Sequence, residues 1–216
     1  MNEEKRKKIL GVIDHTLLDP NADDGRLRRL CEEAAAYGTA SVCVAPSAVA
    51  KVKAAFPSLT VCTVIGFPLG YQTAAAKLAE AADALANGAD ELDMVMNRVD
   101  LKNGRDDAVT EEIRRLKALC GGRTLKVIVE ACDLTEDEKI RACRCVTEGG
   151  ADFIKTSTGF GRGGAALADV ALFRAHIGKN VKIKAAGGIR TASELEAFFD
   201  AGCDRIGASG GVEALK

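Results

Sequence analysis

The sequence has no tryptophan, only two histidines, and aromatic residues at 4% of its 216 positions. So few aromatic side chains argue against the stacking platforms on which proteins bind single-stranded nucleic acid. The formal net charge is −1, so no excess of positive charge would attract nucleic acid or an acidic membrane surface. His15 and His176 are too few and too scattered for a metal centre. We therefore expect no nucleic acid partner, no metal and no cofactor.

Long hydrophobic runs and paired cysteines are also missing. No apolar run approaches the roughly 20 residues that span a bilayer, and the charged stretch at residues 3–8 is unlike a signal peptide. None of the eight cysteines forms a C-x-x-C pair, and most lie in apolar segments, where a reduced thiol acts as a small hydrophobe. We expect a cytoplasmic protein with reduced cysteines and no membrane association.

Eight short β-favouring segments alternate with helical segments along the chain. The expected strands are 12–16, 40–44, 60–65, 91–95, 125–130, the run that begins at 153, 181–185 and 205–207. This alternation is typical of parallel βαβ units. It predicts one domain over residues 1–216 that forms an α/β (β/α)₈ TIM barrel, with a short N-terminal helix at 3–10. A doubly wound open sheet is the alternative.

Local signals mark where several of the helices begin. Asp23 or Asp24 suits the N-cap of the first long helix. The patterns Thr135-x-x-Glu138 and Ser193-x-x-Glu196 predict capping boxes. After the glycine-flanked loop at 66–70, the spacing of Leu78, Ala82 and Leu85 predicts the inner face of a helix.

One short phrase recurs after three of the helices. It reads Gly-Ala-Asp-Glu-Leu-Asp from residue 88, Gly-Ala-Asp-Phe-Ile-Lys from 150 and Gly-Cys-Asp-Arg-Ile-Gly from 202. The glycine suits a left-handed helix end. Counting from it places Asp93, Lys155 and Gly207 at the same height of alternate strands, which share interior layers in such barrels. We expect Asp93 and Lys155 to face one cavity, with room left beside them at Gly207.

Lys155 lies at the end of a buried strand, before a run of small polar residues and glycines. Burial disfavours an ammonium group, so such a lysine is a candidate amine nucleophile for a carbonyl. A lysine that snorkels to solvent or pairs with a carboxylate is the alternative. Lys184, on the next strand, would place a second ammonium nearby and lower the pKa of at least one of the two. Asp93 would then move protons, or serve only as a structural ion pair. Lys182 would lie nearer the barrel bottom, in a structural role.

Glycines cluster after the last three strands, at 159, 161, 187, 188, 207, 210 and 211. Loops after strands seven and eight of such barrels often bind phosphate through backbone N–H groups. The sequence therefore predicts a phosphate site there.

Six segments resemble the deoxyribose-phosphate aldolase family, in order and over nearly the whole chain: 13–17, 42–46, 64–70, 88–95, 153–161 and 184–191. The resemblance implies a metal-free class I aldolase that interconverts 2-deoxy-D-ribose 5-phosphate with acetaldehyde and D-glyceraldehyde 3-phosphate. It implies that Lys155 forms the Schiff base, that Asp93 relays protons and that Lys184 favours the uncharged amine of Lys155. It also implies contacts with the substrate hydroxyls or phosphate from Asp14, Thr16, Thr158, Gly159, Gly187, Gly188, Gly207 and Ser209.

The sequence departs from the family pattern at three places. Gly210 stands where members often have a second serine, residues 97–100 are more polar than expected, and the chain ends at Lys216 without the tyrosine that closes some members. The resemblance suggests a homodimer or homotetramer. Another Schiff-base aldolase, a metal-free phosphosugar isomerase and a non-catalytic phosphosugar-binding protein remain alternatives, and a purely structural barrel fits least.

Overall fold

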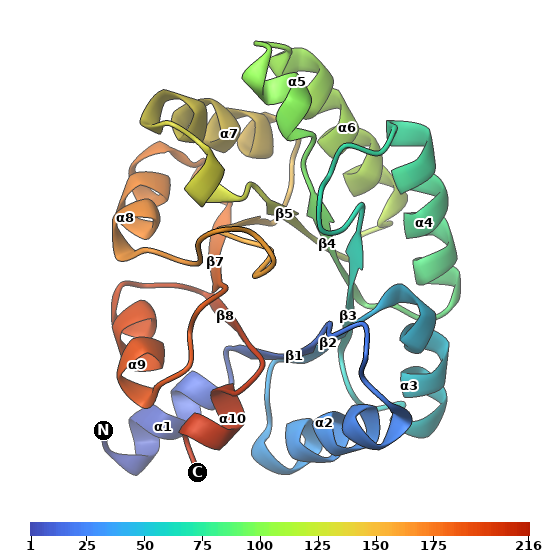
Figure 1. Cartoon of the computed structure of the whole chain (residues 1–216), viewed down its shortest axis with the longest axis vertical. Coiled ribbons are helices and arrows are strands. Elements are labelled where there is room, and N and C mark those ends of the chain that lie inside the picture. The colour runs from blue at the N-terminus through green and yellow to red at the C-terminus, as the bar shows by residue number, and fades with distance from the viewer.

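The computed structural model describes residues 1–216 and contains a closed barrel of eight parallel strands in sequential order (Figure 1). The strands are β1 (Ile13–Leu17), β2 (Ser41–Val44), β3 (Val61–Ile65), β4 (Glu91–Val95), β5 (Thr124–Ile128), β6 (Phe153–Lys155), β7 (Lys182–Ala186) and β8 (Arg205–Ala208). β1 pairs with both β2 and β8, which closes the ring. The predicted (β/α)₈ barrel is confirmed, and the open sheet is wrong.

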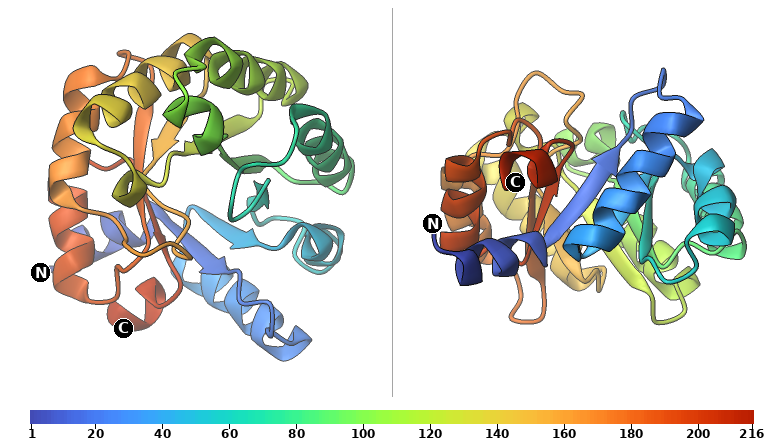
Figure 2. Two further views of the ribbon diagram at one scale, coloured as in Figure 1. Left: turned by 45° about the horizontal axis from the view of Figure 1, so that its top comes forward. Right: turned by 90° about the horizontal axis from the view of Figure 1, so that it is seen from below.

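The helices surround the barrel, as the views in Figure 1 and Figure 2 show. They are α1 (Glu3–Leu10), α2 (Asp24–Tyr37), α3 (Val49–Ala55), α4 (Ala74–Ala86), α5 (Arg98–Lys102), α6 (Asp106–Leu119), α7 (Glu136–Glu148), α8 (Leu167–His176), α9 (Ala192–Asp200) and α10 (Gly211–Ala214), with 3₁₀ turns η1 (Pro46–Ala48) and η2 (Ala131–Asp133). The predicted N-terminal helix is confirmed as α1. The short α5 and α10 were not predicted. No helix combines the length and apolar character that crossing a membrane requires.

Most predicted helix starts are confirmed at the level of single hydrogen bonds. The Asp23 side chain accepts from the Arg26 N–H, and Thr135 and Glu138 form the expected capping box. The prediction for α9 is wrong by two residues, because Thr191 with Glu194 forms the capping box and Ser193 lies inside the helix. Both positions have a glutamate three residues on, so the pattern alone cannot choose between them.

The prediction for α4 is confirmed at Leu78 and Leu85, which are partly buried against the core, and is wrong at Ala82. Lys77, Ala81 and Ala84 point inward, whereas Ala82 is exposed. Lys77 is fully buried, and its Nζ donates to Glu112 Oε2 at 2.9 Å and to the Val95 carbonyl at 2.8 Å. The buried face of α4 includes the charged residue Lys77, and a pattern based on apolar residues alone does not detect it.

The recurring phrase has a structural reason. Each of its glycines has positive φ: 99° at Gly88, 76° at Gly150 and 82° at Gly202. The aspartate two residues later accepts a backbone N–H from the first or second residue of the preceding strand: Asp90 from Val61, Asp152 from Leu125 and Asp204 from Ile183, at 2.8 to 2.9 Å. The glycine and the aspartate of this motif therefore determine how β4, β6 and β8 begin beside the preceding strand.

The main hydrophobic core lies between the strands and the helices, and a small cluster of Cys43, Cys62 and Val64 lies apart from it. The neighbouring β6 and β7 bring Lys155 directly opposite Lys184 in the sheet register. Lys155, the last residue of β6, thus lies beside Lys184 in the middle of β7.

Candidate active site

A cavity of about 420 Å³ opens at the C-terminal ends of β1, β6, β7 and β8. Of the predicted site residues, eight line it: Thr16, Lys155, Thr158, Gly159, Gly187, Gly188, Gly207 and Ser209. Asp14, Asp93 and Lys184 do not line it and are fully buried. The predicted residues therefore form two layers, one that reaches the cavity and one beneath it.

Lys155 reaches from the lower layer to the cavity. It ends β6, is 3% exposed, and its Nζ donates to Asp93 Oδ2 at 2.7 Å. Asp93 is the only carboxylate with which it forms an ion pair. The amine of Lys155 is thus held at the cavity floor by one partner.

Asp93 lies at the centre of the lower layer. Its Oδ2 accepts from both Lys155 and Lys184 at 2.7 Å, and its Oδ1 accepts from Lys126 at 2.9 Å. Burial alone would raise the pKa of Asp93, but the positive charges of these three lysines outweigh burial and hold its pKa well below 3.8. Asp93 is therefore a carboxylate at neutral pH.

Lys184 is held between Asp93 and Asp14, both fully buried. Burial acts to lower the pKa of Lys184, yet the two carboxylates outweigh burial and raise it above 10.5. The expectation that one ammonium lowers the pKa of its neighbour therefore does not apply to Lys184, which stays charged. Asp14 also accepts from Ser41 at 2.8 Å and from Arg205, so hydrogen bonds occupy its oxygens below the cavity.

Sequence reasoning missed three charged residues in this interior. Lys126 Nζ lies 2.6 Å from Glu91 Oε2 as well as 2.9 Å from Asp93. Arg205 pairs with Asp14 and, at 2.8 Å, with Glu91. Glu91 and Lys126 are charged residues inside apolar strands, the same signal that singled out Asp93 and Lys155.

Glu130 was missed as well. It follows β5 with φ 53°, a left-handed conformation that is unfavourable for a residue with a side chain. Its carboxylate is buried, accepts from the backbone N–H of Thr158 at 3.2 Å and also accepts from the Thr158 hydroxyl. Glu130 therefore fixes the loop that carries Thr158 and Gly159 at the cavity wall.

Glycine allows the loops around the cavity to approach one another. Gly159 and Gly187 have φ of 83° and 86°, and a Cβ on Gly187 would lie 3.3 Å from the Gly159 Cα. At Gly207 a Cβ would lie 3.2 Å from Lys184 Cε. The prediction that Gly207 leaves room beside the charged groups agrees with this spacing.

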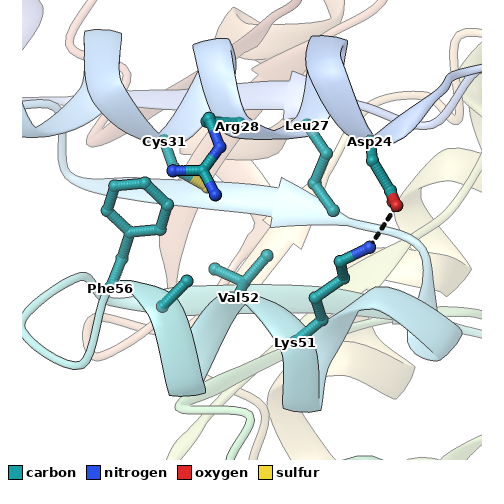
Figure 3. Close-up of a pocket in the computed structure, with 8 residues that line it drawn as sticks. Asp24, Leu27, Arg28, Cys31, Lys51, Val52 and Phe56 are labelled. Atoms are coloured by element: carbon teal, nitrogen blue, oxygen red, sulfur yellow. Dashed lines mark ion pairs between the residues drawn. The ribbon is translucent and has the colours of Figure 1, made fainter.

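Two other features of the structure have no assigned part in this chemistry. A groove of about 270 Å³ runs between α2 and α3, lined by Leu27, Cys31 and Phe56 among others, with an Asp24–Lys51 ion pair at its rim (Figure 3). Inside the barrel, Cys43 and Cys62 lie close to Asp93, but the carboxylate is already bonded to three lysines. We therefore assign no metal ligands there.

A TIM barrel in which a lysine at the carboxyl end of one strand contacts a buried carboxylate and a second lysine just below has the architecture of an enzyme that acts through a lysine amine. A sequence model of the DeoC/LacD family aldolases matches residues 8–215. The chain belongs to the DeoC/LacD aldolase family.

Individual relatives match over nearly their full length. A deoxyribose-phosphate aldolase of Clostridium botulinum (strain Eklund 17B / Type B) is 52% identical over 210 residues, which cover 97% of this chain and 95% of the relative. One of Clostridioides difficile (strain 630) is 50% identical over 211 residues, covering 97% and 96%. The solved structure of the tetrameric deoxyribose phosphate aldolase of Aeropyrum pernix has a TM-score of 0.91 at 32% identity and covers 97% of this chain and 90% of that one.

Proposed function

We propose that this chain catalyses the reversible aldol cleavage of 2-deoxy-D-ribose 5-phosphate to acetaldehyde and D-glyceraldehyde 3-phosphate through a Schiff base on Lys155. The family and the names of its relatives support the reaction. The choice of Lys155 as the nucleophile depends on one observation, the position of its amine. Of the interior cations Lys126, Lys155, Lys184 and Arg205, only Lys155 lines the cavity.

The number of ion pairs supports the same choice. Lys184 pairs with two carboxylates and Lys126 with three, whereas Lys155 has only Asp93, whose Oδ2 it shares with Lys184. A cation with fewer partners loses its proton at a smaller electrostatic cost. Lys155 is therefore the amine best placed to become neutral.

The chemical steps follow from these positions. The neutral Lys155 amine adds to the substrate aldehyde, and loss of water gives an iminium ion. A base takes the proton from the C3 hydroxyl, the C2–C3 bond breaks, and its electron pair forms an enamine while glyceraldehyde 3-phosphate leaves. Protonation of the enamine and hydrolysis then release acetaldehyde and free Lys155. Asp93, 2.7 Å from Lys155 Nζ, is the group that exchanges these protons, directly or through water.

The glycine-rich loops after β6 and β7, which line the cavity, support phosphate binding. Gly159, Gly187 and Gly188 present backbone close to the cavity, and Ser209 adds a hydroxyl. Arg26 and Arg190 also line the cavity and supply positive charge. We assign Thr158, Gly159, Gly187, Gly188, Gly207 and Ser209 to the phosphate side and Thr16 to the hydroxyl side. Asp14 is assigned to holding Lys184.

Two assays test the proposal. Wild-type protein should release glyceraldehyde 3-phosphate from deoxyribose 5-phosphate, and acetaldehyde with borohydride should leave an N-ethyl group on Lys155. Lys155→Met should abolish both, whereas Lys182→Met, at the exposed lower end of β7, should retain both. Isomerisation without cleavage, or tight binding of the sugar phosphate without turnover, would overturn the proposal in favour of an isomerase or a binding protein.

The proposal includes assembly into a homodimer or homotetramer and a cytoplasmic location. The tetrameric relative from Aeropyrum pernix supports the first, and the eight free thiols support the second. Light scattering should give two or four times the 22.6 kDa of one chain. A mass equal to one chain would contradict the assembly, and recovery of the protein in the membrane or extracellular fraction would contradict the location.

A further inference from the structure

A second charged layer lies beneath Asp93 and makes no contact with the cavity. It consists of Glu91 on β4, Lys126 on β5 and Arg205 on β8. Glu91 bonds to both cations, Lys126 reaches up to Asp93, and Arg205 reaches Asp14. The layer thus connects to both carboxylates that hold Lys184.

The formal charges of the connected groups leave one cation in excess. Asp14, Glu91 and Asp93 supply three negative charges. Lys126, Lys184 and Arg205 supply three positive charges, and Lys155 is the fourth cation. With Lys155 uncharged, the network is neutral. Because charges in a buried site interact strongly, this balance matters more here than at a surface.

We propose that Glu91, Lys126 and Arg205 are positioning residues that balance the charge of the barrel interior and so set the pH at which Lys155 becomes a free amine. None of the three touches the cavity, and they act through Asp93 and Asp14. This inference rests on the proposed function only for the identity of the nucleophile.

Other titratable groups also lie near Lys155, and two further cations, Arg26 and Arg190, line the same cavity without joining the ion-pair network. Around Lys155 lie Asp14 on β1, Cys43 on β2, Cys62 on β3, Glu91 and Asp93 on β4, Lys126 and Glu130 on or after β5, Lys184 on β7 and Arg205 on β8. Burial raises the pKa of the Cys62 thiol well above 9.0, which keeps it neutral. The hydrogen bond with Cys62 lowers the pKa of Cys43, so a Cys43→Ser background is included in the test. Glu130 bonds to Thr158 and forms no ion pair with the network.

The charge balance predicts opposite effects for two substitutions. Glu91→Gln removes a negative charge, so the free amine of Lys155 forms at lower pH. Lys126→Met removes a positive charge, so the Lys155 amine stays protonated up to a higher pH. A shift of one pH unit corresponds to about a tenfold change in the free amine on the acid side of the curve. The double variant Glu91→Gln/Lys126→Met restores the balance and should lie close to wild type.

The measurement is the rate of reductive ethylation of Lys155 by acetaldehyde and cyanoborohydride between pH 5 and pH 10, read by peptide mass spectrometry. The neutral amine condenses with the aldehyde, water leaves, and hydride reduces the iminium ion. The midpoint of the curve of ethylation rate against pH should lie at lower pH for Glu91→Gln and at higher pH for Lys126→Met. In the double variant it should lie close to the wild-type value. Lys182→Met should leave it unchanged, because that lysine is exposed and water screens its charge. The same signs should appear in the Cys43→Ser background.

The inference would be overturned if the midpoint moved in the same direction in both single variants. It would also be overturned if the midpoint moved in neither variant. If Lys126→Met fails to fold, Arg205→Met removes a positive charge of the same layer and must raise the midpoint instead. Cleavage of deoxyribose 5-phosphate is assayed separately on the wild type. If the wild type cleaves the substrate but the midpoints do not move, only this inference is wrong. If the midpoints move as expected but the wild type does not cleave the substrate, only the proposed function is wrong.

Discussion

The Nζ atoms of Lys155 and Lys184 each lie 2.7 Å from the same oxygen, Oδ2 of Asp93. Lys184 has a second carboxylate, Asp14, and Lys155 has none. The two lysines are therefore unequal although they lie opposite each other in the sheet. Lys184 is held as a fixed cation, and Lys155 is the amine that we propose to react.

Asp93→Asn should slow turnover by about 10² to 10⁴, the range usual for loss of a positioned acid–base group. The asparagine keeps the size of the side chain but removes the charge that holds three lysines. Release of glyceraldehyde 3-phosphate measures the effect, and ethylation at Lys155 with excess acetaldehyde should persist. Turnover within twofold of wild type would contradict the assigned role.

Gly207→Ala should reduce kcat by roughly tenfold to 10²-fold, because small displacements of catalytic groups have effects of this size. The new methyl would lie 3.2 Å from Lys184 Cε and 3.0 Å from Ala186 Cβ. Gly210→Ala is the matched control, since a Cβ there meets nothing within 4 Å. Equal kinetics in the two variants would show that Gly207 does not make room for Lys184.

Glu130→Ala should raise KM for the sugar phosphate about tenfold, because the Thr158 N–H and hydroxyl lose their acceptor and the loop at the cavity wall loosens. Ethylation of Lys155 by acetaldehyde, which has no phosphate, should change little. Glu130→Gln keeps one acceptor oxygen and should have a smaller effect. A purely structural role would instead impair both reactions alike.

Lys77→Met tests a buried ion pair outside the barrel. Removing one partner of such a pair costs about 3 kcal/mol, because Glu112 is left buried without its cation. Urea unfolding should show the loss, while kcat of the folded enzyme stays at the wild-type value. The double variant Lys77→Met/Glu112→Met should recover part of the stability, and a single variant as stable as wild type would refute the expectation.

The barrel network predicts how stability depends on pH. The pKa values of Asp14 and Asp93 are held below 3.8 in the folded protein, so their contribution is present above about pH 4 and is lost as the pH falls further. The pKa values of Lys126 and Lys184 are raised above 10.5, so their contribution is present below that pH and is lost as the pH rises through the folded values.

Urea unfolding at a series of pH values measures this dependence, and a single cooperative transition is expected of one domain. Asp14→Asn removes one depressed carboxylate, so the free energy of unfolding should fall less steeply below pH 4 than in wild type. An unchanged slope would show that Asp14 does not contribute through its ionisation.

The sequence by itself determined the order of the strands and most helix starts, because these depend on short-range signals. Alternation of apolar segments, the Asp23 cap and the box at Thr135 act over a few residues. The presence of a charged residue within an apolar strand pointed to Asp93, Lys155 and Lys184 as site residues. Glu91 and Lys126 carry the same signal but were not predicted. The predictions failed at Ala82 in α4 and at the N-cap of α9, where a local pattern is compatible with more than one arrangement.

Only the tertiary structure decided which residues share a contact and how their charges balance. Arg205 and Asp14 are separated by 191 positions and meet because β8 pairs with β1 to close the barrel. Likewise, nothing near Lys155 in sequence shows that it has one carboxylate partner whereas Lys184 has two. Strand order follows from local periodicity, but the state of an ionisable group depends on every charge that the closed barrel brings near it.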